Sequence, residues 1–210
     1  MRRTVARTID PGRYAPTREA THLPRRLFHM AAASLFPVLA LVLARDMLLT
    51  LLLGTATLMV GAEALRVAFP RFNALFRQAF RGLMRAEEER HVTGATYVLL
   101  GTLACFALFP RDLAILAVLF VALGDPAAAL VGRRFPRGRV FGKSPWGSLA
   151  MVATGLAVGG LLHAAGAVEF HWIMAVGAVV ATAAELLPLP LDDNLRVPLL
   201  AGGAMTLLAV

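Results

Sequence analysis

The sequence has little charge, few aromatic residues and a single cysteine. Of its 210 residues, 16% are charged and 8% are aromatic, whereas 58% are hydrophobic. A soluble domain carries about a quarter charged residues, so this composition argues against a soluble globular protein. One cysteine, Cys105, excludes a disulfide framework within the chain and a cysteine-based zinc site. The apolar residues instead form long blocks, the pattern of transmembrane helices.

The blocks predict an all-α fold, a polytopic membrane bundle of about seven transmembrane helices. We expect one domain over residues 25–210, preceded by a basic tail over residues 1–24 that is cytoplasmic rather than a cleaved signal. The predicted helices are Leu27–Ala44, Met47–Phe69, Thr93–Phe109, Leu113–Gly132, Gly147–Gly166, His171–Leu187 and Leu195–Val210.

The distribution of positive charge predicts the orientation of this bundle. Nineteen of the 21 Lys and Arg residues lie before the first predicted helix or in and beside every second connection, and only Arg45 and Arg111 fall on the other side. The positive-inside rule then places the N-terminus in the cytoplasm and the C-terminus outside. The net charge of +8 is explained by this bias without nucleic acid as a partner. We expect a multi-pass protein of a prokaryotic plasma membrane.

The longest cytoplasmic connection, residues 70–92, is amphipathic. Its phenylalanines and leucines recur at helical spacing with arginines between them, so it either lies in the headgroup plane or packs on the bundle. Within it, Glu87–Glu89 reads as a solvated acidic face. Just before it, Glu63 and Arg66 are three residues apart, a spacing at which the two side chains can pair on a helix.

Polar clusters interrupt the apolar blocks, and all of them map to the predicted cytoplasmic side. Ionisable groups at membrane depth are expensive and indicate function by default. In Gly124-Asp125-Pro126, we expect the proline to break the fourth predicted helix and the aspartate to bind a hard cation such as Mg²⁺. Lys143 with Ser144 can neutralise a phosphate, although the full spacing of a P-loop is absent.

Further polar residues on the same side extend this candidate site. Glu185 closes the sixth predicted helix, and a proline-containing turn leads from it to Asp192-Asp193-Asn194, an acidic group suited to a metal or a general base. The remaining candidates open the first and third predicted helices: Arg25, Arg26, His29, Thr93, Gly94 and Thr96.

Taken in order, these segments resemble the CTP-dependent lipid kinases, the family of dolichol kinase, phytol kinase and CTP-dependent diacylglycerol kinase. The resemblance runs from Arg25 to about Gly202. It is carried by Arg25-Arg26-Leu27-Phe28-His29, Thr93-Gly94-Ala95-Thr96-Tyr97, Gly124-Asp125-Pro126-Ala127-Ala128-Ala129, Val131-Gly132-Arg133-Arg134, Gly142-Lys143-Ser144, Gly147-Ser148-Leu149-Ala150, Glu185, Asp193-Asn194-Leu195 and Pro198-Leu199.

The resemblance implies transfer of the γ-phosphate of CTP, with a divalent cation such as Mg²⁺, to a membrane lipid alcohol: a polyprenol, phytol or geranylgeraniol, or diacylglycerol. The expected catalytic residues are Asp125, Lys143, Glu185, Asp193 and His29, of which Asp125, Asp193 and Glu185 are the expected metal ligands. The expected nucleotide-binding residues are Arg25, Arg26, Thr93, Gly94, Gly124, Arg133, Arg134, Gly142, Ser144, Gly147, Ser148 and Asn194.

One position departs from the family pattern, and two other functions stay open. Trp146 stands where the family usually has an acidic residue. A phosphatidate cytidylyltransferase would also use CTP, a metal and a membrane, but its C-terminal Lys-Asp and Pro-Gly-His-Gly-Gly signature is absent. A transporter would place polar groups on both sides or at mid-depth, whereas here they gather on one side. The sequence predicts neither the lipid acceptor nor the oligomeric state.

Overall fold

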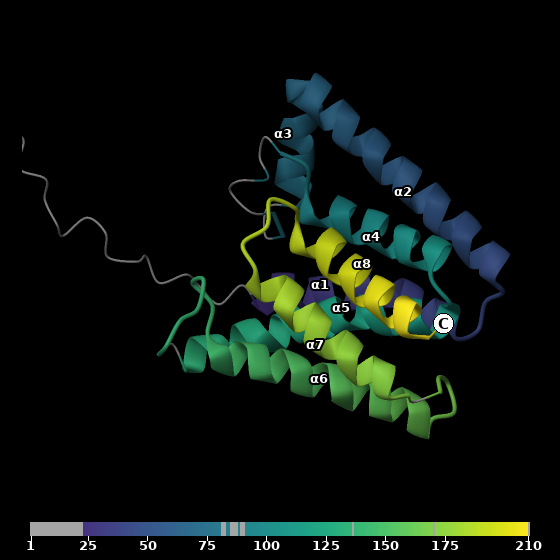
Figure 1. Cartoon of the computed structure of the whole chain (residues 1–210). Coiled ribbons are helices and arrows are strands. Elements are labelled where there is room, and N and C mark those ends of the chain that lie inside the picture. The colour runs from purple at the N-terminus through teal and green to yellow at the C-terminus, as the bar shows by residue number, and fades with distance from the viewer. Residues whose placement is uncertain are drawn as a thin grey trace, which may run out of the picture.

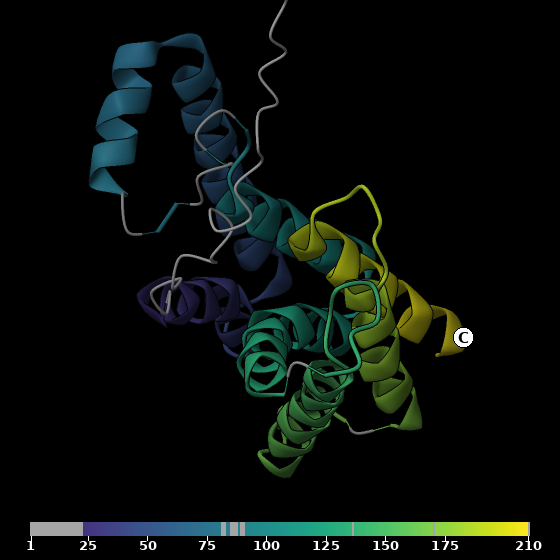
Figure 2. The same ribbon diagram turned by 90° about the vertical axis from the view of Figure 1, so that its left-hand side faces the viewer.

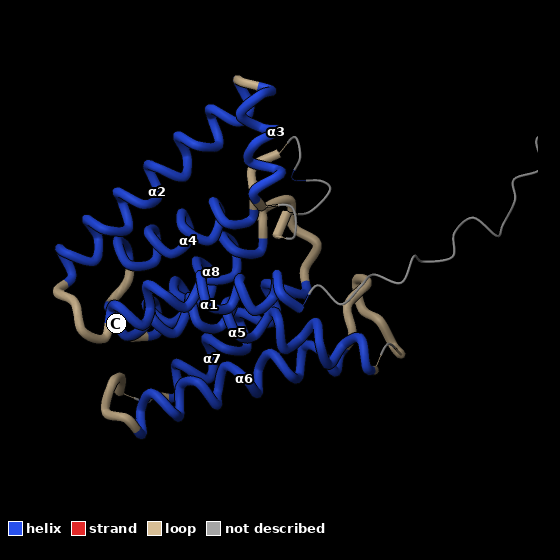
Figure 3. Tube along the Cα trace, turned by 180° about the vertical axis from the view of Figure 1, so that it is seen from behind, coloured by secondary structure: helices blue, strands red, loops and turns tan. Residues whose placement is uncertain are grey.

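The computed structural model describes residues 23–80, 83–84, 88, 91–135, 137–169 and 171–209. This part of the chain forms eight helices and contains no strand (Figure 3). The helices are α1 (Leu23–Ala40), α2 (Arg45–Ala68), α3 (Pro70–Ala79), α4 (Gly94–Leu108), α5 (Arg111–Arg134), α6 (Pro145–Ala164), α7 (Trp172–Leu186) and α8 (Asp193–Leu208).

All seven predicted helices are present, as α1, α2 and α4–α8, and α3 lies within the amphipathic connection. Three of them, α2, α5 and α6, are long and apolar enough to cross a membrane, whereas α4 and α7 are apolar but only 15 residues long. These are the features of a helical membrane protein. The number of spans and their orientation stay predictions.

The core is organised around α5. All residues from Leu113 to Ala122 are buried, whichever side of the helix they lie on. One core cluster joins α5 to α6, α7 and α8, and a second joins α5 to α1, α2 and α4. Figure 1 shows α5 in the middle of the bundle with α2 as an outer element. The free energy gained by burying the apolar side chains of Leu113–Ala122 offsets the cost of the polar residues that follow on α5.

Pro126 does not break α5, so the prediction of a broken helix is wrong. The helix continues from Arg111 to Arg134 with Pro126 buried inside it. A proline inside a helix removes one backbone hydrogen bond and costs about 3 kcal/mol. The extensive packing of α5 against α6 and α8 outweighs that cost, which is why Asp125 remains on a regular helix.

The outer surface is strongly apolar. Leu58, Leu161 and Leu207 are each more than 70% exposed, and they lie on α2, α6 and α8. A soluble monomer rarely exposes large contiguous apolar surface, so these side chains are suited to lipid.

In α3 no residue is buried, and Leu75 is 66% exposed. Figure 2 shows α3 beside the end of α2, turned away from the central helices. Its place in the headgroup plane stays a prediction.

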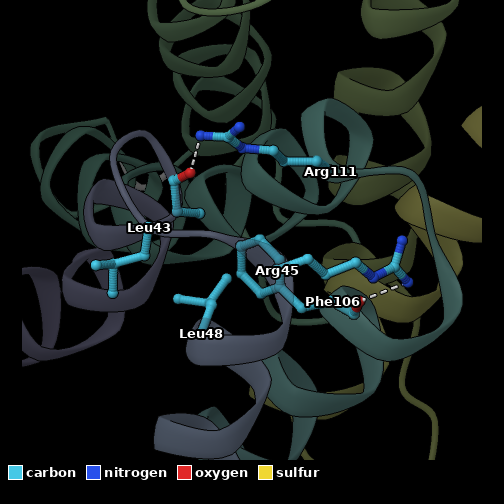
Figure 4. Close-up of a pocket in the computed structure, with 6 residues that line it drawn as sticks. Leu43, Arg45, Leu48, Phe106 and Arg111 are labelled. Carbon is cyan, nitrogen blue, oxygen red and sulfur yellow. Dashed lines mark hydrogen bonds between the residues drawn. The ribbon is translucent and has the colours of Figure 1, made fainter.

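The two ends of the bundle differ in composition. The ends of α4, α5, α6, α7 and α8 that carry the predicted polar residues lie together on the left of Figure 1. At the opposite end, Arg45 donates to the carbonyls of Phe106 and Ala107, both at 3.1 Å, and Arg111 donates to the carbonyl of Ala40 (Figure 4). These arginines satisfy the terminal carbonyls of α4 and α1. They have a structural role.

Candidate active site

Lys143 lies at the centre of a charged cluster drawn from three parts of the chain. Its Nζ is 2.6 Å from Glu185 Oε1 and 3.5 Å from Asp193 Oδ2, and it also donates to the main-chain carbonyl of Glu185. Lys143 is the only lysine among the 21 Lys and Arg residues of the chain. The predicted meeting of Lys143, Glu185 and Asp193 is therefore present in the structure.

A tight turn presents Lys143 to this cluster. Val140 and Lys143 exchange both of their backbone hydrogen bonds, at 2.9 and 3.0 Å, across the two residues Phe141 and Gly142. Just beyond the turn, the Ser144 hydroxyl donates to the carbonyl of Phe135 at 2.6 Å and is buried. This hydrogen bond connects the residue before α6 to the residue after α5. It therefore closes the loop that carries Lys143.

The acidic side of the cluster is formed where α7 ends and α8 begins. Asp192 caps α8 by accepting the backbone N–H of Asn194 at 2.9 Å, a common way to satisfy a helix start. The buried side chain of Arg196 donates to the carbonyl of Leu189 at 3.0 Å and to Asp193. The prolines of this turn stop α7, and Arg196 holds the turn against α8.

Asp125 joins this cluster from α5. It is half-buried and lies close enough to Glu185 for the two carboxylates to repel each other. Glu185 therefore contacts Lys143 and has two further carboxylates nearby, those of Asp125 on α5 and Asp193 on α8. Among the described residues, no three His, Cys, Asp or Glu side chains are already arranged around a metal site. The Lys143 ammonium occupies the space between Glu185 and Asp193, so the predicted metal ligands stay a prediction.

Two glycines of the predicted nucleotide site serve helix packing. A Cβ at Gly147 would lie 2.7 Å from the carbonyl oxygen of Ala128, and one at Gly124 would lie 2.9 Å from Met151 Cγ. Both distances are too short for a side chain, so these glycines let α5 and α6 approach closely. The hydroxyl of Ser148, the residue after Gly147, is buried with no hydrogen-bond partner among the described residues.

A second buried polar network lies beside this cluster, around Glu63 and Arg66. The two side chains form an ion pair at 2.7 Å, as predicted, and Arg66 is only 2% exposed. Glu63 accepts from the Thr93 backbone and hydroxyl at 3.0 and 2.6 Å and from the Thr96 hydroxyl at 3.2 Å. The network therefore holds the first turn of α4 to the end of α2.

Sequence reasoning missed the role of Glu88 in this network. Its carbonyl accepts from Arg66 at 2.8 Å, its Oε1 accepts the Gly94 N–H at 2.8 Å, and the residue is buried. The prediction of a solvated face is wrong for Glu88, because it satisfies a free N–H at the start of α4. Glu87 and Glu89 lie outside the described residues.

The two networks meet where α4 packs on α8. A Cβ at Gly94 would lie 3.2 Å from Glu88 Oε1 and 3.5 Å from Asn194 Nδ2, and one at Gly101 would lie 2.5 Å from the Asn194 carbonyl oxygen. Asn194 thus lies between the start of α4 and Asp193, which contacts Lys143. Thr93, Gly94 and Asn194, which the sequence placed in one site, are neighbours in the structure.

The remaining predicted residues lie at the same end of the bundle. Arg133 and Arg134 are exposed on the last turn of α5, and the Arg134 guanidinium lies 5.7 Å from the centre of the Phe135 ring. Gly142 is exposed with a φ of +81°. Arg25, Arg26 and His29 are half-buried on the first turns of α1. Roles for these residues in binding or catalysis stay predictions.

Comparison with known proteins reveals distant relatives. CTP-dependent diacylglycerol kinase 1 of Eremothecium gossypii is 31% identical over 117 residues, 54% of this chain and 36% of the relative. The protein of the same name in Schizosaccharomyces pombe is 26% identical over 154 residues, 66% of this chain and 71% of the relative. An uncharacterized protein of Rickettsia prowazekii is 26% identical over 181 residues, 83% of this chain and 88% of the relative.

The first of these matches spans only about a third of the fungal protein's length. No protein-family model matches the chain, and no solved structure matches it. The kinase matches agree with the resemblance that the motifs carry. The chain is similar, over about half to two thirds of its length, to two CTP-dependent diacylglycerol kinases.

Proposed function

We propose that this protein is an integral-membrane lipid kinase that transfers the γ-phosphate of CTP to the hydroxyl of a lipid alcohol. The observation that carries the proposal is the convergence of Lys143, Glu185 and Asp193, from three separate segments, at one end of an apolar bundle. The kinship with CTP-dependent diacylglycerol kinases supports CTP as the donor and makes diacylglycerol the first acceptor to test. Polyprenols and phytol or geranylgeraniol are the other candidate acceptors.

Phosphoryl transfer depends on positioning and charge neutralisation more than on covalent chemistry by the protein. The lipid hydroxyl oxygen attacks the γ-phosphorus, the bond from that phosphorus to the β,γ-bridging oxygen breaks, and CDP leaves. In this scheme Lys143 moves from Glu185 to the phosphates and neutralises charge that develops on the leaving CDP. The hydroxyl proton passes to a carboxylate of the cluster or to His29.

The donor set fits a hard divalent cation. Mg²⁺ prefers oxygen ligands and is usually held by one or two carboxylates together with substrate phosphates. Asp125 and Asp193 would hold the ion, with Glu185 as a third candidate. When bound, the ion would neutralise phosphate charge. Glu185 already accepts from Lys143, so its main role is to keep the lysine within reach of the phosphates.

The proposal is tested with purified protein in nanodiscs that contain Mg²⁺ and γ-labelled CTP or ATP. Each nucleotide is paired with diacylglycerol, phytol, geranylgeraniol and a long polyprenol. We expect label in a lipid phosphate with CTP, and we expect Asp125→Asn to lose that activity while folding normally, because an amide is a far weaker ligand for a hard cation. The variant's helix content and thermal unfolding serve as the folding control.

Three results would count against the proposal or against one of its assignments. Formation of a CDP-lipid with release of pyrophosphate would identify a cytidylyltransferase. Full activity of Asp125→Asn would remove Asp125 from the metal site. Absence of labelled lipid with every donor and acceptor, from protein shown to be folded, would turn attention to Trp146 in place of the acidic residue.

A further inference from the structure

The loop that carries Lys143 has a strained aromatic residue at its tip. Phe141 has a φ of +48° and Gly142 a φ of +81°, and the two residues connect the backbone pair of Val140 and Lys143. Positive φ at both central residues is the signature of a type I′ turn, which favours Asn, Asp or Gly. A bulky residue with positive φ is a genuine outlier. Strain of this kind concentrates at functional sites.

Phe141 gains little from packing that would offset this strain. Phe141 is 63% exposed and Val140 is 44% exposed. Near the base of the loop, Phe135 and Trp146 are 49% and 55% exposed, with their ring centres 5.9 Å apart. The loop therefore presents apolar and aromatic side chains outward. Figure 1 shows the loop extending beyond the ends of α5 and α6.

The charged residues within the loop's own sequence are all basic. Arg133, Arg134, Arg137 and Arg139 are exposed in or beside the loop. No acidic residue occurs in the sequence between Asp125 and Glu169. Aromatic side chains amid unopposed arginines suit the boundary between anionic headgroups and acyl chains. The loop joins α5 and α6, two helices that are long and apolar enough to cross a membrane.

We propose that the loop tip, Val140 and Phe141, inserts into the anionic lipid surface of the membrane that surrounds the bundle, with the loop arginines on the headgroup phosphates. Lys143 lies two residues after Phe141 and contacts Glu185 and Asp193. Insertion therefore sets the lysine cluster at the depth of the headgroups, where a lipid hydroxyl lies. The link to a lipid hydroxyl rests on the proposed function, whereas the insertion itself does not.

The insertion is tested without any enzyme assay. In a background of Trp146→Phe and Trp172→Phe, Phe141→Trp creates a single reporter at the tip. In vesicles containing phosphatidylglycerol, we expect phospholipids brominated near the glycerol end of their acyl chains to quench this reporter more strongly than aqueous acrylamide does. The control is Glu169→Trp in the same background, because the Glu169 side chain is 85% exposed in the loop between α6 and α7, and acrylamide should dominate there. Acrylamide dominating at position 141 would overturn the proposal.

A cysteine probe provides a second measurement if the tryptophan variant folds poorly. The native Cys105 is fully buried, so a polarity-sensitive dye attached to Phe141→Cys reports from the tip. We expect blue-shifted emission that strengthens as the phosphatidylglycerol fraction rises. Emission typical of water at every lipid composition would contradict insertion.

Phe141→Asn separates the effect of strain from the effect of lipid contact. Asparagine suits the turn, so we expect thermal stability to stay equal or to rise. Loss of the apolar contact should raise the KM for the lipid acceptor about tenfold with the KM for CTP unchanged, whereas Phe141→Leu should stay near the parent. A rise in the KM for CTP alone would assign the tip to the nucleotide instead. If no variant shows kinase activity, the proposed function fails while the quenching data still decide the insertion.

Discussion

Replacing Lys143 by methionine is expected to lower kcat/KM for CTP by about 10²- to 10³-fold. Lys143 is the one cation that reaches both Glu185 and Asp193 in the described residues, and a preorganised charge aimed at a developing charge contributes on this scale. The measurement is steady-state transfer of labelled phosphate at varied CTP with saturating lipid. Lys143→Arg keeps the positive charge but replaces a compact ammonium group by a planar guanidinium group. We therefore expect partial activity from this variant.

The control addresses the carboxylate that the methionine leaves behind. Lys143→Met leaves the buried Glu185 without its partner, which by itself destabilises a protein. The double variant Lys143→Met/Glu185→Gln removes both charges, so it should regain stability yet remain inactive. Recovery of activity in the double variant would show that Lys143 has only a structural role. Protection of Lys143, the only lysine side chain, from an amine-reactive reagent by CTP gives a direct binding readout.

Arg66→Ala is expected to lower the free energy of unfolding by about 3–5 kcal/mol. The change leaves Glu63 buried without a cation, and removing one member of a buried ion pair has this cost. It also removes the donor to the Glu88 carbonyl. For a chain of this length the midpoint of thermal unfolding should fall by about 10 °C, measured by circular dichroism in one detergent.

The matched control is Arg71→Ala, an exposed arginine on the neighbouring helix α3. A surface substitution of this kind should change stability by less than about 0.5 kcal/mol. The double variant Glu63→Ala/Arg66→Ala completes a thermodynamic cycle, and we expect it to lose less stability than the two single variants together. Additive losses would mean that the ion pair contributes nothing beyond its separate contacts.

The seven apolar helices were predictable because long apolar blocks in a sequence have few alternatives to helix. The effect of Pro126 was not predictable, since it depends on how tightly α5 is packed by helices distant in sequence. The gathering of Lys143, Glu185 and Asp193 agrees with the up-and-down order of the predicted helices, which brings their connections to one end of the bundle.

The roles of individual polar residues were harder to predict than their location. Ser144 and Gly147 occur in motifs that suggest phosphate binding, yet the serine closes a loop and the glycine allows α6 to approach α5. Glu88 occurs in an acidic run and nevertheless becomes buried. In each case the deciding partner is a backbone atom, the carbonyl of Phe135 or Ala128 or the N–H of Gly94. Backbone atoms have no signature in a sequence.

The burial of α5 on every side insulates the middle of the molecule from the bilayer. Residues Leu113–Ala122 meet protein in all directions, so acyl chains touch the surrounding helices and not this stretch of α5. Asp125 follows three residues later and is only half-buried, at the edge of this insulated stretch. A change in membrane composition therefore reaches residues Leu113–Ala122 only through the packing of the surrounding helices.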